Sequence, residues 1–235
     1  MLRQSCKLMF IGALLLALSA SWLASASHAG TILPNPAPVT LSSLLAQGAT
    51  YTVGDKKFSG FSYLSTGDMP AAGGVNVAPI IDEDGNFGIR FQGAFVDLPS
   101  SQGGSDAFIE YMVEALDPNK LISDAHLAGN PTLLGTQGSI SVTETFLPLG
   151  PGGEYTMKIF DDESVGQKLT DQTFFNPPVR KLNVQKDILV IATPNSQTVT
   201  MSFVDQTFSQ IPEATTITLA LISLVSLVGY RGRRR

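Results

Sequence analysis

Apolar and polar side chains alternate with a period of two residues along much of the middle of this chain, and this alternation is the strongest constraint on its fold. In the segment GSISVTETF, residues 138–146, it places Ile140, Val142 and Phe146 on one face and leaves Glu144 as the polar exception there. A β-strand with one buried face has this period, whereas an amphipathic helix repeats about every 3.6 residues. The segment is therefore predicted to be a half-buried strand.

The same reasoning predicts further strands, separated by frequent glycine and proline turn signals. They cover residues 50–53, 58–64, 74–81, 87–96, 106–116, 154–160 and 198–203. Residues 106–116 also contain good helix formers, but the spacing of Ile109, Tyr111 and Val113 favours a strand. One short helix is expected, at residues 41–47.

The run ILVIA, residues 188–192, lacks polar alternation, which is typical of a strand buried on both faces. The following TPNSQ favours a turn, so residues 188–192 and 198–203 are predicted to form a β-hairpin. Many short strands without long helices predict an all-β fold, an antiparallel, jelly-roll-like β-sandwich. No linker divides residues 30–210, so the sandwich is expected to be one domain.

Residues 1–29 have the pattern of a signal peptide. Arg3 and Lys7 precede a short apolar run, and small residues at 24–26 and 27–29 predict cleavage by signal peptidase after Ala26 or Ala29. The alternative is an uncleaved anchor. Cleavage would follow export through the Sec translocon and would remove Cys6, the only cysteine of the chain.

Residues 211–235 have the pattern of a short membrane anchor. Residues 214–230 carry no charge, and as a single transmembrane helix they would span about 25 Å, slightly less than a hydrocarbon core of about 30 Å. Four arginines follow, and arginines beside a span stay on the cytoplasmic side: Arg231, Arg233, Arg234 and Arg235. The predicted topology puts the body outside and the tail inside, with the inner membrane as a transient anchor. The simplest alternative is a permanent C-terminal anchor.

The order of Pro212-Glu213, a short apolar span and terminal arginines resembles the PEP-CTERM sorting signal of exported bacterial proteins. Ala214 stands where that motif usually has a second proline. Segments of the body resemble a recurrent body type of the same proteins: residues 51–63, 88–95, 120–131, 138–146 and 204–214.

This resemblance implies exosortase as the processing partner and a location at the cell surface or outside the cell. It also implies a non-enzymatic surface or matrix protein associated with exopolysaccharide and biofilm, and it assigns no activity to named residues of the body. The alternative function is a secreted carbohydrate-binding or carbohydrate-active sandwich that uses the same sorting tail.

The residues that could carry chemistry are few. The chain has two histidines, His28 and His126, so a histidine-rich zinc site is excluded, and no G-x-S-x-G serine motif or phosphate-binding loop occurs. His126 is expected to be structural, and no cofactor and no catalytic residue is predicted. Between the two terminal segments, nine Lys and Arg face 19 Asp and Glu, a net charge of about −10 that disfavours nucleic acid as a partner.

The strongest candidate ligand site in the sequence is the acidic stretch DEDGN, residues 82–86. Asp82, Asp84 and Asn86 supply oxygens of the kind that Ca²⁺ prefers, but the full calcium loop is incomplete, and the simpler interpretation is a hairpin tip. Residues 161–163 form a similar acidic turn. Carbohydrate binding would require aromatic side chains on an open face. A cluster occurs at Tyr51, Phe58, Phe61 and Tyr63, but its alternation favours the core.

Overall fold

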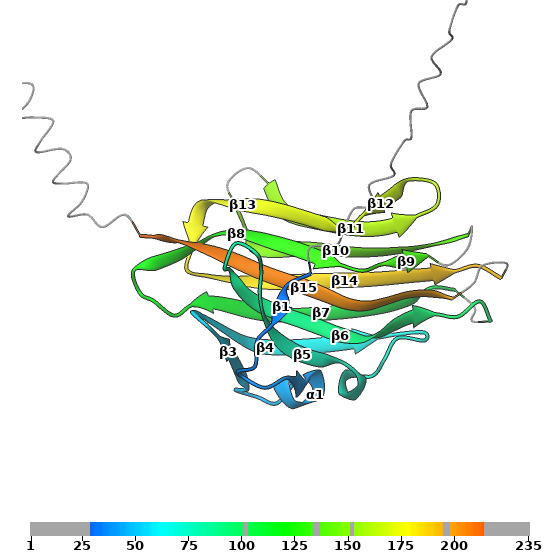
Figure 1. Cartoon of the computed structure of the whole chain (residues 1–235), viewed down its shortest axis with the longest axis horizontal. Helices are drawn as coiled ribbons and strands as arrows, with labels where there is room; N and C mark the ends of the chain where they lie inside the picture. Colours follow the sequence, from blue (N-terminus) through cyan, green and yellow to red (C-terminus); the bar gives the residue numbers. More distant parts are fainter. Residues whose placement is uncertain (1–28, 101–102, 134–136, 151–152, 195–197, 214–235) are drawn as a thin grey trace, which may run out of the picture.

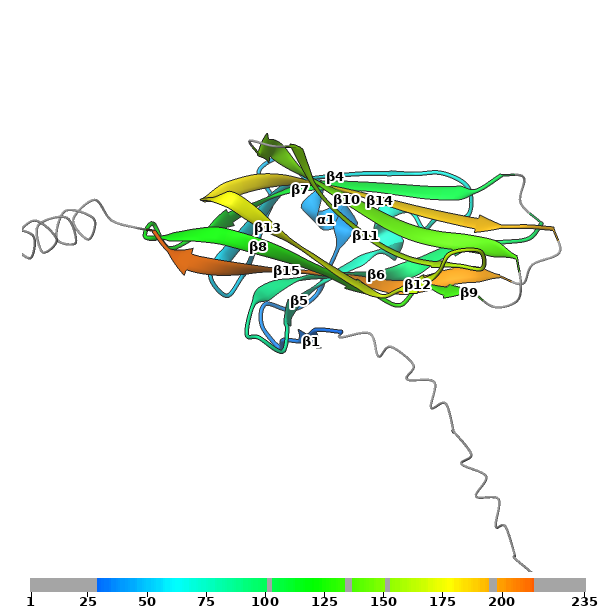
Figure 2. The same cartoon turned by 90° about the horizontal axis from the view of Figure 1, so that it is seen from above.

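A computed structural model describes residues 29–100, 103–133, 137–150, 153–194 and 198–213. Almost every element is a strand, and the strands form two antiparallel sheets that face each other (Figures 1 and 2). The only helices of the described part are one turn each, α1 (Leu41–Leu44) and the 3₁₀ helix η1 (Ala72–Gly74). The predicted all-β antiparallel sandwich is therefore confirmed, and the predicted helix is present in shorter form.

Sheet A contains, in spatial order, six strands: β1 (Thr31–Ile32), β5 (Asn76–Ile81), β6 (Phe87–Asp97), β15 (Val199–Pro212), β8 (Lys120–Gly129) and β13 (Thr170–Val179). Two short strands are added at its margins, β2 (Val39–Thr40) beside β5 and β9 (Thr132–Leu133) beside β15. Sheet B contains seven: β12 (Gly166–Lys168), β11 (Gly153–Asp162), β10 (Gly138–Gly150), β14 (Lys181–Ala192), β7 (Ser105–Ala115), β4 (Lys56–Ser65) and β3 (Thr50–Val53).

The last two strands of the chain close the fold. β14 inserts between β10 and β7 in sheet B, and β15 inserts between β6 and β8 in sheet A. The order β6-β15-β8-β13 therefore faces β7-β14-β10-β11, and most connections cross from one sheet to the other. Two Greek keys wound in this way make a jelly roll. The closing contacts join strands far apart in sequence, such as β6 with β15.

The predicted hairpin between residues 188–192 and 198–203 is wrong. The first segment belongs to β14 in sheet B and the second to β15 in sheet A, so the connection between them crosses the sandwich. Both edges of each strand are occupied by other partners. Alternation reports which face of a strand is buried, but it does not report which strand lies beside it.

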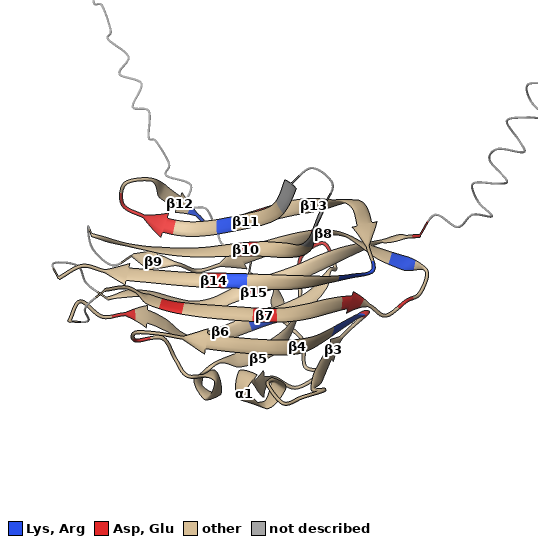
Figure 3. Ribbon diagram, turned by 180° about the vertical axis from the view of Figure 1, so that it is seen from behind, with Lys and Arg blue, Asp and Glu red and all other residues tan. Residues whose placement is uncertain are grey.

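The prediction that residues 188–192 are buried on both faces is also wrong. Ile188, Val190 and Ala192 lie in the core, whereas Leu189 is 38% exposed and Ile191 is partly exposed on the outer face of sheet B. The exposed Asp187 lies on this outer face, two residues before Leu189 on the same strand. Figure 3 marks where charged residues occur along the strands of this sheet. In a two-layer sandwich no third layer covers that face, so every strand of sheet B can bury only one side.

The sequence analysis did not predict two of the long strands, β8 and β13. In β8 a bulge at Ser123 breaks the period of two, so that Ile122 and Ala125 both face the core although they are three positions apart. β13 contains two adjacent prolines and lies at the edge of its sheet. Proline is tolerated on an edge strand because one of its sides makes no ladder hydrogen bonds.

The core between the sheets is rich in aromatic rings. Tyr111 packs against Phe58 and Phe91 with centroid distances of 6.0 and 5.7 Å, and Phe208 packs against both Phe58 and Phe146. The cluster of Tyr51, Phe58 and Phe61 is buried, and Tyr63 packs against the core, so the core interpretation of these residues is confirmed.

Both ends of the described chain lie against sheet A. At the N-terminal end, β1 pairs with β5. At the C-terminal end, β15 continues to Pro212, two residues past the predicted boundary at 210, and the amide of Glu213 donates a hydrogen bond to the carbonyl of Asn119 (2.7 Å). Among the described residues, no helix has the length and apolar character that a membrane crossing needs.

Candidate functional site

A hollow of about 390 Å³ opens on the outer face of sheet A. Its floor comes from the middle of β15, β8 and β13, where the register places Thr207 beside His126 and His126 beside Gln172. The next row along the same strands is Asp205, Ala128 and Thr170. Because side chains two residues apart share a face, both rows point out of the sandwich into the hollow.

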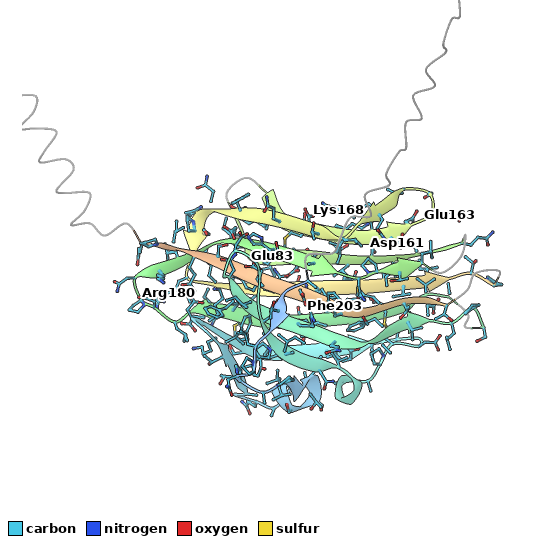
Figure 4. The ribbon with its side chains drawn as sticks, viewed as in Figure 1. Glu83, Asp161, Glu163, Lys168, Arg180 and Phe203 are labelled. Carbon is cyan, nitrogen blue, oxygen red and sulfur yellow. The ribbon has the colours of Figure 1, made fainter. Side chains whose placement is uncertain are left out.

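The loop of residues 82–86 between β5 and β6 forms one wall of the hollow, and Glu83 marks its place in Figure 4. Asp82 holds this loop together. Its Oδ1 accepts hydrogen bonds from the amides of Asp84 (3.0 Å) and Asn86 (2.8 Å). Its Oδ2 accepts from the Asn86 side chain (3.0 Å) and from the Thr207 hydroxyl (2.6 Å), which ties the loop to β15.

The loop is therefore a hairpin tip of the type that the simpler interpretation predicted. Both oxygens of Asp82 already accept bonds from protein donors, and Gly85 takes the positive φ of 85° that the turn requires. Within the part of the chain that the structure describes, no group of three or more His, Cys, Asp or Glu side chains is placed to hold a metal ion. The Ca²⁺ assignment to Asp82, Asp84 and Asn86 gains no support from this geometry.

His126 lies half-buried at the floor of the hollow, with Asp124 and Ser209 beside it. Its Nε2 is 2.9 Å from Asp124 Oδ1 and 3.4 Å from the Ser209 hydroxyl. The hydrogen bond to Asp124 raises the pKa of His126, although burial acts in the opposite direction. Burial would raise the pKa of Asp124, but hydrogen bonds from His126, Ser209 and Ser123 outweigh it and lower that pKa.

This histidine, serine and aspartate do not have the geometry of a catalytic triad. In a triad the carboxylate binds one ring nitrogen and the serine binds the other, so that the ring can pass a proton between them. Here Asp124 and Ser209 both contact Nε2. The arrangement instead fixes the orientation of the ring, as expected for a structural histidine.

A buried ion pair supports the other end of the floor. Arg90 on β6 donates from Nε to Asp205 Oδ1 (2.6 Å) and from Nη2 to Asp205 Oδ2 (2.7 Å). Its guanidinium lies 4.2 Å from the centre of the ring of Phe203, the residue that Figure 4 labels on β15. Gly30 completes the group: its amide donates to Asp205 Oδ2 (2.7 Å) and its carbonyl accepts from Arg90 (3.0 Å). These two hydrogen bonds of Gly30 hold the segment before β1 beside the hollow.

An exposed aromatic ring continues the outer face of sheet A beyond the hollow. Phe174 lies on β13 two residues from Gln172, pairs in register with Asp124, and is 64% exposed. An exposed phenylalanine loses the stabilisation that burial would provide, so a ring in this place is available to pack against a ligand.

The other residues singled out in the sequence lie elsewhere. Ala29 is exposed just before Gly30, and Pro212 and Glu213 are exposed at the end of β15. Ala26, Ala214 and the four arginines lie outside the described residues, so their predicted roles stay predictions.

The acidic turn at residues 161–163 begins the connection between β11 and β12 in sheet B. Asp162 Oδ1 accepts from the amide and hydroxyl of Ser164 (2.9 and 2.6 Å), which lower the pKa of Asp162. Asp161 Oδ2 accepts from the Leu133 amide (3.1 Å) and the Gln167 side chain (3.1 Å). These bonds account for Asp161 and Asp162 without a ligand.

Sequence reasoning missed most of the hollow. Ala128, Gln172 and Thr207 belong to no motif with a known chemical role, and they come from three strands that are neighbours only in space. The repeated tetrapeptide DQTF, at 171–174 and 205–208, was the one available signal, since each copy contributes residues to the hollow.

Comparisons with known proteins add little to this description. No protein-family model and no curated protein matches the chain. Among solved structures, a carbohydrate-binding module, TmCBM61 in complex with β-1,4-galactotriose, matches with a TM-score of 0.30 and 11% identity, over 64% of this chain and 88% of that chain. The enzymatically active domain of tailspike protein 4 of bacteriophage CBA120 matches with a TM-score of 0.26 and 11% identity, over 63% of this chain and 19% of that chain.

Likenesses this weak carry no argument about activity. The fold and the hollow together define the class of this protein, an antiparallel β-sandwich with a polar hollow on the outer face of one sheet.

Proposed function

We propose that this protein is a non-enzymatic carbohydrate-binding β-sandwich that acts at the cell surface or outside the cell, where it associates with exopolysaccharide. The hollow on sheet A carries the proposal, because it combines hydrogen-bonding side chains with a neighbouring exposed aromatic ring. His126, Gln172 and Thr170 offer donors and acceptors there, and Phe174 offers an apolar face on the same strand as Gln172. Sugars present hydroxyls at their edges and apolar faces to stacking rings, so both chemistries are needed.

The charge of the hollow narrows the ligand to a neutral or amino-sugar polysaccharide. Its lining includes Asp82, Glu83 and Asp84, and among the described residues that line it none is Lys or Arg. Carboxylates accept hydrogen bonds from sugar hydroxyls, but they repel uronate and phosphate groups.

The proposed location rests on the two terminal segments. A signal peptide at residues 1–29 would direct export, and the Pro212-Glu213 motif with its apolar span and arginines would present the chain to exosortase. In the fold, β15 ends at Pro212 and Glu213 follows it, both exposed, so removal of the tail would leave the hollow intact.

A binding screen with variants tests the proposal. Purified protein is run in native gels that contain neutral polysaccharides such as β-glucan or galactan, or anionic alginate, and retardation is measured. We expect retardation by at least one neutral polymer, none by alginate, and a loss of affinity of about tenfold or more in Phe174→Ala and Gln172→Ala.

The matched control is Leu64→Ala, which removes an equally exposed apolar side chain (71%) from sheet B. It should bind like the wild type. If both sheet A variants are still retarded, or if Leu64→Ala abolishes retardation, the binding surface lies elsewhere. Failure to bind any neutral polymer would refute the proposal.

A further inference from the structure

Three charged or polar side chains meet inside the apolar core between the sheets, and none of them lines the hollow. Lys186 on β14 and Glu144 on β10 are cross-strand neighbours in sheet B, and both are fully buried. Gln206 reaches them from β15 in the opposite sheet and is also fully buried. We call these three residues the buried Lys–Glu–Gln cluster. Glu144 is the polar exception that the alternation of residues 138–146 revealed.

The contacts within the cluster are close. Lys186 Nζ is 2.6 Å from Glu144 Oε2 and 3.3 Å from Gln206 Oε1. The other atom of the Gln206 carboxamide, Nε2, donates to the carbonyl of His126 (3.0 Å), which fixes the orientation of the amide. An amine, a carboxyl group and a carboxamide therefore share one water-excluded space.

Two buried polar atoms in and beside the cluster lack the hydrogen bonds that a stable buried ion pair needs. Glu144 Oε1 and the hydroxyl of Tyr111 are both buried and find no hydrogen-bond partner among the described residues. The aromatic rings of Phe58 and Phe91 pack against Tyr111. A buried charge pair with an orphaned oxygen gains little stability compared with apolar side chains of similar volume.

The protonation state of the pair follows from its burial. Desolvation lowers the pKa of Lys186, and desolvation raises the pKa of Glu144, although the attraction between the two groups opposes both shifts. Both desolvation effects favour transfer of the ammonium proton to the carboxylate across the 2.6 Å contact. That transfer leaves a neutral amine, which is a nucleophile, beside a carboxyl group, which is an acid.

We propose that the cluster forms an intramolecular isopeptide bond between Lys186 and Gln206, with Glu144 as the proton carrier. The neutral Nζ attacks Cδ of Gln206, and the electrons of the carbonyl move to Oε1. Glu144 donates its proton to Nε2, the electrons on Oε1 return to re-form the carbonyl, the bond from Cδ to Nε2 breaks, and ammonia leaves. The carboxylate of Glu144 then takes the extra proton from Nζ. One amide replaces another, so no oxidant or other reactant is needed.

Such a bond would join the two sheets through their closing strands. β14 and β15 are central in sheet B and sheet A, so a covalent link between them would resist separation of the layers. The chain has a single cysteine and cannot form an internal disulfide. The proposal concerns the core alone and is independent of which ligand the hollow binds.

Mass spectrometry of the purified full-length protein tests this directly. Asp-N cuts before Asp187 and before Asp205, which separates the peptide that ends at Lys186 from the peptide that begins at Asp205. We expect these two peptides to remain joined, with a combined mass lower by one ammonia, about 17 Da. Trypsin should also fail to cut after Lys186 in the denatured protein.

Two variants control for folding. Lys186→Arg keeps the positive charge and cannot form the amide, and Glu144→Gln keeps the shape of the side chain but removes the proton carrier. Circular dichroism checks that each variant is folded, and each folded variant should yield the two separate peptides. Separate peptides of full mass from the folded wild type would overturn the proposal, and so would linkage that persists in folded Glu144→Gln.

Discussion

Arg90 donates two parallel hydrogen bonds to the carboxylate of Asp205, from Nε to Oδ1 at 2.6 Å and from Nη2 to Oδ2 at 2.7 Å. Asp205 as a whole is 3% exposed, and burial raises its pKa even though Arg90 and Gly30 both act to lower it. This ion pair links β6 to β15, and through the hydrogen bonds of Gly30 it also links the segment before β1 to both strands. Its two-pronged geometry is one that lysine cannot reproduce.

Arg90→Met is therefore expected to destabilise the fold by about 3–5 kcal/mol at pH 7, because it leaves a buried carboxylate without a partner. Urea unfolding followed by circular dichroism measures the loss. The unpaired Asp205 would have a further raised pKa, so the loss should shrink as the pH falls and the carboxyl group becomes protonated. Lys57→Met is the control. It breaks the exposed pair with Glu114 and should cost less than about 1 kcal/mol.

The pKa of His126 should fall when Asp124 is changed to Asn. The raised pKa means that the folded state favours the charged ring. The pair therefore contributes stability that is fully present below the unfolded value of 6.5 and is lost as the pH rises through the folded pKa. NMR titration of the His126 ring checks the shift. Ser209→Ala removes the longer contact and should change the pKa much less. An unchanged titration in Asp124→Asn would show that the aspartate does not govern this histidine.

Asp187→Asn is expected to raise the melting temperature at pH 7 to 8. Burial, together with a hydrogen bond and repulsion from Asp106, raises the pKa of Asp187 from 3.8 to about 6. A raised carboxyl pKa gives stability that is present below the unfolded value of 3.8 and is lost as the pH rises through about 6. The gain in the variant should therefore disappear near pH 4. Equal gains at both pH values would contradict this linkage.

Asp82→Ala should destabilise the protein by about 1–2 kcal/mol, because it removes the acceptor for the loop amides and for Thr207. Glu83→Ala, in the same loop but exposed, is the matched control and should unfold like the wild type. Millimolar Ca²⁺ should leave the wild-type melting temperature unchanged. A clear rise that Asp84→Ala abolishes would restore the Ca²⁺ assignment.

The processed protein from its native host should begin at Gly30 and lack everything beyond about Ala214. Cleavage after Ala29 would place the new ammonium group of Gly30 against Asp205, where the amide now donates at 2.7 Å. Intact-mass measurement identifies both ends at once. A protein that retains Arg231 to Arg235 would argue against processing by exosortase, and a start at Ser27 would favour the earlier cleavage site.

The amino-acid sequence by itself determined the local features of this protein. Side-chain alternation identified β3, β6 and β7 almost to the residue, and it marked Glu144 as a polar side chain on a core face. These features are readable because the period of a strand depends only on its own residues and on which face water reaches. The expectations about the terminal segments have the same local origin.

Only the tertiary structure decided which strands meet. The neighbours of β14 and β15 come from distant parts of the chain, so a strong local turn signal predicted a hairpin that does not form. The hollow, the pairing of Arg90 with Asp205 and the approach of Gln206 to Lys186 depend on the same long-range register. Cross-strand contacts are set by the packing of two whole sheets against each other, and no short window of sequence contains that information.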